Sequence, residues 1–140
     1  MMIVRRFRFY AAHRNPALQD KCARLHGHRY GVEVTLSFPS KGQGGIGMLF
    51  ADIDRSISEV FEALDHRTLL AEDDPLCDAG IEGAVVLPCA TSAENLAALL
   101  LRRCMARNPA CVRIQLQETD SSLIDCTKED ADTWLAPHIA

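Results

Sequence analysis

The sequence predicts a single α+β domain in which two strands are followed by two helices and then by two more strands, β-β-α-α-β-β. Three observations support this order: strand-like hydrophobic alternation near the N-terminus, apolar residues at helical spacing in the middle, and renewed alternation near the C-terminus. The chain of 140 residues is long enough to bury a core as one domain, 1–140. We expect an antiparallel sheet with both helices on one face. Its open edges favour association into an oligomer.

Composition excludes several classes of protein. The chain is 48% hydrophobic and 24% charged, as is ordinary for a globular protein, and its formal charge of −4 argues against a general nucleic-acid binder. No apolar run approaches the length of a membrane span, and the N-terminal residues contain no signal-peptide block. The six cysteines are scattered without a Cys-x-x-Cys pair. We therefore expect a cytoplasmic protein that contacts neither nucleic acid nor membrane.

The first strand is predicted from Ile3 to His13. Its odd positions are mostly apolar, with Arg5 as the exception, and this face leads directly to His13. An inward histidine is either a hydrogen-bonded core residue or a ligand, and the first strand alone leaves both interpretations open.

The second strand places His26 and His28 on the same face as the apolar positions from Val32 to Phe38. An antiparallel pairing with the first strand would bring His13 beside them. Three neutral imidazoles with an open fourth position are typical of catalytic zinc. Cys22 lies just upstream, close enough to share the pocket. The alternative is a loop with two exposed histidines.

The first helix is predicted from apolar residues at helical spacing between Ile53 and Leu64, with Asp52 or Asp54 as its cap. Asp65 and His66 follow directly. A carboxylate beside a histidine suggests acid–base chemistry, and a charged turn at the end of a helix explains the pair equally well.

The second helix is predicted to begin with a capping box formed by Thr91 and Glu94 and to end near Arg107. A third strand alternates from Val112 to Glu118, and a fourth runs over 123–127. Because carboxylates are seldom buried without a partner, Glu118 either turns outward or binds something.

Basic residues gather around the histidine motif in a protein that is acidic overall. They are Arg14, Lys21, Arg24 and Arg29. Such a cluster would concentrate a polyphosphate substrate, and ordinary surface charge is the alternative explanation.

Five short motifs, in order along the chain, resemble the family of 6-pyruvoyl-tetrahydropterin and 6-carboxytetrahydropterin synthases. They are Phe9-Tyr10-Ala11-Ala12-His13-Arg14, Cys22-Ala23-Arg24-Leu25-His26-Gly27-His28, Leu64-Asp65-His66, Ser92-Ala93-Glu94-Asn95 and Gln117-Glu118-Thr119. The resemblance implies the tunnelling fold (T-fold), in which sheets of several subunits join into a barrel. Two barrels then stack into a homohexamer, a dimer of trimers, with active sites between subunits.

The resemblance also implies a role for each matching residue. His13, His26 and His28 would bind Zn²⁺. Cys22 would be the catalytic thiol, with Asp65 and His66 as its proton-relay partners. Glu118 would anchor the pterin, and Thr119, Ser92 and Arg24 would add substrate contacts.

The implied reaction is that of a zinc-dependent lyase. It converts 7,8-dihydroneopterin triphosphate to 6-carboxy-5,6,7,8-tetrahydropterin, a queuosine precursor, and releases triphosphate and acetaldehyde. Three residues separate Cys22 from His26, which is the spacing of the carboxytetrahydropterin branch. The alternatives are a pyruvoyl-tetrahydropterin synthase, a pterin side-chain aldolase, or a binding module without catalysis. One departure is Leu49, where many members of the family have an aspartate.

Overall fold

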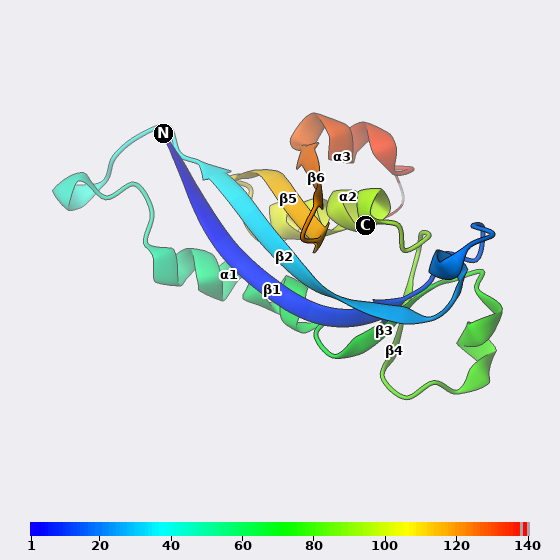
Figure 1. Cartoon of the computed structure of the whole chain (residues 1–140). Coiled ribbons are helices and arrows are strands. Elements are labelled where there is room, and N and C mark those ends of the chain that lie inside the picture. The colour runs from blue at the N-terminus through cyan, green and yellow to red at the C-terminus, as the bar shows by residue number, and fades with distance from the viewer. Residues whose placement is uncertain (138, 140) are drawn as a thin grey trace.

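A long antiparallel hairpin lies in the middle of the sheet in the computed structural model, which describes residues 1–137 and 139 (Figure 1). Its strands are β1 (Met2–His13) and β2 (His26–Ser37). They pair along their whole length, and His13 lies directly opposite His26. The predicted hairpin is therefore confirmed.

Among residues 1–137 and 139, six strands form the sheet, in the order β4-β3-β1-β2-β5-β6. The remaining strands are β3 (Arg67–Ala71), β4 (Ala84–Leu87), β5 (Cys111–Thr119) and β6 (Ser122–Thr127). β1, β2, β5 and β6 are the four predicted strands and pair antiparallel, whereas β3 and β4 are parallel additions in a region without a predicted strand. Both are short, and β3 pairs with only two residues of β1, so neither carries enough alternation to be recognised.

The part of the chain that the structure describes contains three α-helices: α1 (Phe50–Glu62), α2 (Ala93–Arg107) and α3 (Lys128–Trp134). α1 contacts β1, α2 contacts β5 and β6, and these two helices also contact each other. The inward side chains of β1 and β2 form one continuous core with the buried faces of α1 and α2. The two predicted helices are therefore confirmed, and α3 is a third that was not predicted. None of the described helices is long and apolar enough to cross a membrane.

Arg5, the exception in the apolar face of β1, is explained by α1. Its guanidinium donates two hydrogen bonds to the Asp54 carboxylate, at 2.9 and 2.6 Å. Asp54 therefore pairs with the sheet and does not cap the helix. The residue that precedes α1 is Leu49, whose side chain makes no capping hydrogen bond. The predicted cap at Asp52 or Asp54 is wrong, because the helix begins at Phe50, three residues before the first buried apolar position, Ile53.

The start of α2 also differs from the prediction. Ser92, not Thr91, is the N-cap, and its hydroxyl accepts a hydrogen bond from the Asn95 amide at 3.3 Å. The Thr91 side chain is buried and turned toward Arg14, to whose carbonyl oxygen its hydroxyl donates a hydrogen bond. The predicted Thr91–Glu94 capping box is therefore wrong by one position at its first residue.

Candidate active site

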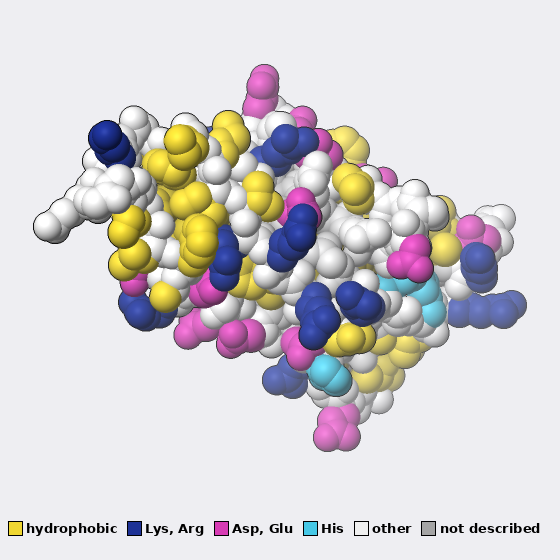
Figure 2. Space-filling view, turned by 60° about the vertical axis from the view of Figure 1, so that its left-hand side comes forward, with side chains coloured by type: hydrophobic (Ala, Val, Ile, Leu, Met, Phe, Trp, Pro, Cys, Tyr) yellow, Lys and Arg dark blue, Asp and Glu magenta, His cyan; other side chains and the backbone are white. Residues whose placement is uncertain are grey.

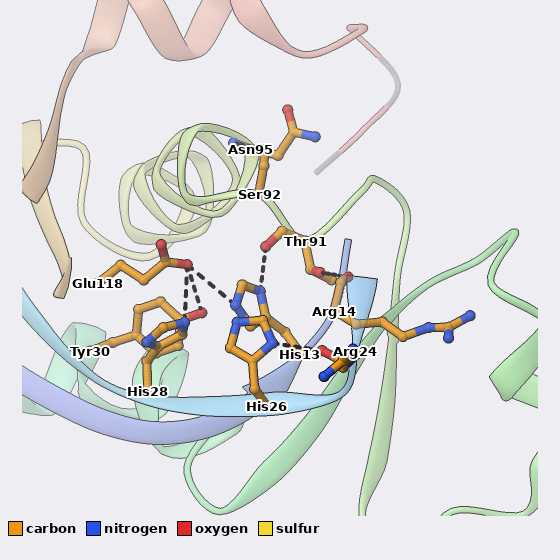
Figure 3. Close-up of polar contacts among 10 residues, drawn as sticks. All are labelled: His13, Arg14, Arg24, His26, His28, Tyr30, Thr91, Ser92, Asn95 and Glu118. Atoms are coloured by element: carbon orange, nitrogen blue, oxygen red, sulfur yellow. Dashed lines mark hydrogen bonds and ion pairs between the residues drawn. The ribbon is translucent and has the colours of Figure 1, made fainter. Parts of the chain in front are cut away.

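Three histidines converge where the β1–β2 hairpin ends (Figure 3). One side-chain nitrogen from each of His13, His26 and His28 lies within 4.8 Å of the others. They meet because His13 ends β1, while His26 and His28 begin β2 two positions apart and so point to one face. Cross-strand pairing then places the three rings around one point, as the sequence predicted.

Backbone carbonyls orient two of the rings. The Nδ1 of His13 lies 2.8 Å from the carbonyl oxygen of Thr91, and the Nδ1 of His26 lies 2.7 Å from that of Arg24. Because a carbonyl oxygen only accepts hydrogen bonds, each Nδ1 must carry the hydrogen, which leaves the lone pair on Nε2. This arrangement is typical of histidines that bind a metal through Nε2.

The Glu118 carboxylate faces the same point from β5. Its Oε1 lies 3.3 Å from the Nε2 of His13 and 3.8 Å from the Nε2 of His28, and it accepts the hydroxyl hydrogen of Tyr30 at 3.4 Å. The Nε2 of His13 is buried and makes no hydrogen bond within the described residues. Burial lowers the pKa of both His13 and His28, which favours neutral rings.

A divalent cation fits these residues. A neutral imidazole presents a lone pair at Nε2, and so does a carboxylate oxygen, so the two repel unless positive charge lies between them. Three nitrogens and a nearby carboxylate suit zinc and also other first-row divalent metals. The described residues thus provide a candidate metal centre without identifying its metal.

The histidines line a cavity of about 630 Å³. Cys22 enters it from a 3₁₀ turn, η1 (Lys21–Ala23), and the first turn of α2 forms another part of its wall. Polar groups share the lining with apolar ones, which include Leu18, Leu116, Leu123 and Ile124. The cavity is large enough for a small molecule with a flat ring.

Cys22 lines the same cavity as the histidines, but its protein neighbours together raise the pKa of its thiol, although Lys21 acts in the opposite direction. Burial raises the pKa of the Cys22 thiol, and the Asp20 carboxylate raises it further. Asp20 also accepts a hydrogen bond from the Cys22 amide at 2.7 Å, which fixes the turn. A thiolate here therefore needs positive charge from a cation in the cavity.

Of the four basic residues expected around the histidines, only Lys21 lines the cavity. Arg14 donates two hydrogen bonds to the buried Asp74 carboxylate, each 2.8 Å long. Arg29 lines a separate groove on the opposite face of the sheet. Arg24 contributes its carbonyl to His26, but its side chain does not line the cavity. Within one subunit, three of the four residues of the expected basic cluster therefore lie outside the cavity lining.

Neither Asp65 nor His66 lines this cavity. Asp65 accepts hydrogen bonds from the Nδ1 of His66 at 2.9 Å and from the amide of Tyr10 at 2.8 Å. The His66 ring packs against Tyr10, which is on the exposed face of β1, opposite to His13. Histidine side chains accordingly reach the surface at two separate places in Figure 2. Within one subunit, the pair is not brought to Cys22.

Ser92, Glu118 and Thr119 line the cavity as the sequence led us to expect. Two further residues hold the site and were not singled out: Thr91, through its carbonyl, and Tyr30, through its hydroxyl. Tyr30 shares the inward parity of His26 and His28, which could have indicated its place. A backbone carbonyl such as that of Thr91 leaves no signal in the sequence.

The sequence profile of the family described as 6-pyruvoyl tetrahydropterin synthase matches residues 2–129.

The chain belongs to this family.

Relatives with assigned names agree with this membership. A Halobacterium salinarum protein named "Probable 6-carboxy-5,6,7,8-tetrahydropterin synthase" is 32% identical over 105 residues, covering 71% of this chain and 66% of the relative. A Rickettsia bellii protein named "6-carboxy-5,6,7,8-tetrahydropterin synthase" is 38% identical over 71 residues, covering 50% of this chain and 51% of the relative. The chain thus matches about half to two thirds of the length of these relatives.

Solved structures show the same fold. An uncharacterized protein from Wolinella succinogenes superposes with a TM-score of 0.78 at 20% identity, covering 91% of this chain and 98% of the other. The 6-pyruvoyl tetrahydropterin synthase of Caenorhabditis elegans gives a TM-score of 0.69 at 23% identity, covering 91% and 94%. The α+β fold that the tunnelling-fold resemblance implies for one subunit is therefore confirmed.

Proposed function

We propose that the protein is a zinc-dependent lyase that converts 7,8-dihydroneopterin triphosphate to 6-carboxy-5,6,7,8-tetrahydropterin, with release of triphosphate and acetaldehyde. The observation that carries the proposal is one cavity that contains three convergent imidazoles, a thiol and the Glu118 carboxylate. The names of the relatives from Halobacterium and Rickettsia support the same reaction. The product would enter queuosine synthesis in the cytoplasm.

Different side chains of the cavity would contact different parts of the substrate. Glu118 would accept two hydrogen bonds from the N–H groups at the guanidine-like edge of the pterin. Ser92 and Thr119 line the wall and would contact the ring or its side chain. Lys21, rather than Arg24, would attract the triphosphate, because the side chain of Lys21 lines the cavity and that of Arg24 does not.

The three histidines would hold zinc through their Nε2 atoms. When bound, zinc would supply a Lewis acid that makes a C–H bond in the side chain of the substrate more acidic. The Cys22 thiolate would take that proton as a general base. Cys22 and the three histidines line the same cavity, so one bound substrate would lie beside both the base and the zinc site.

Asp65 and His66 would serve a neighbouring subunit. The aspartate holds the Nδ1 hydrogen of His66, which would leave Nε2 free to exchange a proton with substrate. Because the pair lies outside the cavity of its own subunit, it would complete the site of another copy. The edge strands β4 and β6 would join such copies into barrels and then into a homohexamer.

Product analysis tests the proposed reaction. Purified protein is assayed for bound metal and then incubated with 7,8-dihydroneopterin triphosphate, with the products identified by mass spectrometry. We expect zinc, 6-carboxytetrahydropterin and acetaldehyde. A pyruvoyl or hydroxymethyl pterin would support the alternative synthase or aldolase instead. Unchanged substrate with zinc-loaded protein would contradict a catalytic role.

Substitution of Cys22 separates catalysis from a purely structural metal. If Cys22 is the base, Cys22→Ala retains zinc and loses activity by about 10²- to 10⁴-fold. If Cys22 is a fourth ligand, as in closed structural sites, the variant loses zinc. Cys77→Ala is the matched control, because Cys77 is also a partly exposed free thiol but does not line the cavity.

A further inference from the structure

The C-terminal segment extends past the family match, which ends at residue 129. Most of α3 lies in this extension, and the segment is held firmly on α2. Arg102 donates hydrogen bonds to the carbonyl oxygens of Ala131 at 2.7 Å and Leu135 at 2.8 Å. It also bonds to further carbonyls, those of Asp132, Ala136 and Ile139. Ala131 and Leu135 are buried, so the segment packs as part of the fold.

Trp134, at the end of α3, is an exception to this packing. Its side chain is largely exposed, with a relative accessibility of 61%, so burial does not explain it. Its indole Nε1–H donates a hydrogen bond of 2.8 Å to the Oδ1 of Asn95, in the first turn of α2. Asn95 in turn donates from Nδ2 to the carbonyl oxygen of Ala90 at 3.0 Å. The extension is thereby tied to the turn that precedes α2.

The same turn orients a candidate metal ligand. The carbonyl of Thr91, the residue after Ala90, accepts the Nδ1 hydrogen of His13 (Figure 3). Thr91 is buried, and its hydroxyl donates to the carbonyl oxygen of Arg14 at 2.8 Å. The position of this turn therefore sets the direction of the His13 ring.

We propose that Trp134 is a positioning residue for the metal centre. By holding Asn95, and through it Ala90, the indole fixes the turn whose Thr91 carbonyl aims His13 at the cation. This inference rests on the proposed metal site and adds a contribution from an extension that the family match does not include.

Trp134→Phe tests the proposal, because it keeps a six-membered aromatic ring and removes the pyrrole ring that carries the N–H donor. The Zn²⁺ or Co²⁺ dissociation constant is measured by competition with a chelator. It should rise by about 3- to 10-fold, less than the roughly 10- to 100-fold cost of changing a direct partner of a ligating histidine. In the Co²⁺ form, the visible absorption bands should shift as well. Thr133→Ala is the matched control, since the Thr133 hydroxyl bonds to Glu129 and Asp130 of its own helix.

A double-mutant cycle with Asn95→Ala tests the route. If the indole acts through Asn95, adding Trp134→Phe to Asn95→Ala changes the dissociation constant no further. Additive effects, or a Trp134→Phe protein with unchanged metal affinity and Co²⁺ spectrum, would overturn the inference and leave the proposed function intact. A wild-type protein that binds neither metal would overturn both. Thermal unfolding of each variant shows whether the fold is retained.

Discussion

Glu118 is the residue on which the most contacts of the site converge. His13, His28 and Tyr30 all approach the same oxygen, Oε1. Only Tyr30 brings a permanent hydrogen-bond donor, since burial and the Glu118 charge raise the pKa of its hydroxyl far above neutrality. Tyr30 therefore fixes the carboxylate that would receive the pterin.

Tyr30→Phe should lower kcat/KM by about 10-fold, mainly through a higher KM, because one hydrogen bond to a charged group is lost. The free energy of unfolding should change little, since the ring keeps its stacking on Phe9. Steady-state kinetics and urea unfolding measure the two effects. A loss of kcat at unchanged KM would contradict the role of Tyr30.

The Arg14–Asp74 ion pair makes the free energy of unfolding depend on pH. The two hydrogen bonds from Arg14 hold the pKa of the Asp74 carboxyl below its ordinary value. The stabilisation is therefore complete above the unfolded-state pKa, about 3.9, and is lost as the pH falls through the lower folded-state value. Asp74→Asn should cost about 3 kcal/mol at neutral pH, because the Asp74 side chain is only 1% exposed.

Urea unfolding of wild type and Asp74→Asn at several pH values checks this expectation. The difference between their unfolding free energies should be constant from pH 7 to pH 5 and should shrink below pH 4. A difference that persists unchanged at pH 3 would show that packing, rather than charge, accounts for the cost.

At the scale of elements, α1 has a start that can be improved. Its N-cap residue, Leu49, is 53% exposed and its side chain bonds to no amide of the first turn. An aspartate here would accept a hydrogen bond from a free N–H and would also favour the positive end of the helix dipole.

Leu49→Asp should therefore raise the free energy of unfolding by about 1 kcal/mol at neutral pH. Urea denaturation measures this gain, with Leu49→Ala as the control that removes the leucine without adding a cap. Equal stability of the two variants would mean that the free amides of α1 are satisfied by water.

The sequence predicted long elements well and short ones poorly. β1 and β2 each supply twelve residues of alternation, which also specified the face of His13, His26 and His28. β3 and β4 have five and four residues, too few for a period to be distinguished from chance. Two adjacent hydroxyl residues, Thr91 and Ser92, made the start of α2 ambiguous, because only backbone geometry decides which of them caps.

The candidate site was likewise predicted only where a local pattern specified it. The cluster of three histidines and Glu118 follow from strand parity, which is a local property. The separation of Asp65 and His66 from Cys22 depends on which face of the sheet the backbone reaches after α1, and no periodicity encodes that choice. The ion pair of Arg14 was missed as well. Its partner, Asp74, lies 60 positions away in the sequence, and no local pattern connects the two.

At the scale of the whole molecule, the separated halves of the site predict complementation between subunits. Cys22→Ala and His66→Ala proteins should each be inactive as homo-oligomers. Mixed oligomers formed by refolding the two variants together should recover part of the activity, because some sites would combine an intact Cys22 from one subunit with an intact His66 from another.

Light scattering establishes the assembly, and activity is measured against the mixing ratio. Mixing either variant with itself is the control. If mixed assemblies stay inactive, both residues act within one subunit, and the relay assigned to Asp65 and His66 would need a rearrangement of the turn after α1.

The hairpin of β1 and β2 has a consequence for the order in which the protein is made. All three imidazoles leave the ribosome between positions 13 and 28, whereas the carbonyl that aims His13 follows 78 positions later. If the three rings bind an ion as proposed, a nascent polypeptide would present them before Thr91 and Glu118 have been translated. Discrimination between metals would then depend on the completed protein, since this early segment contains the Arg24 carbonyl that orients His26 but not the Thr91 carbonyl that orients His13.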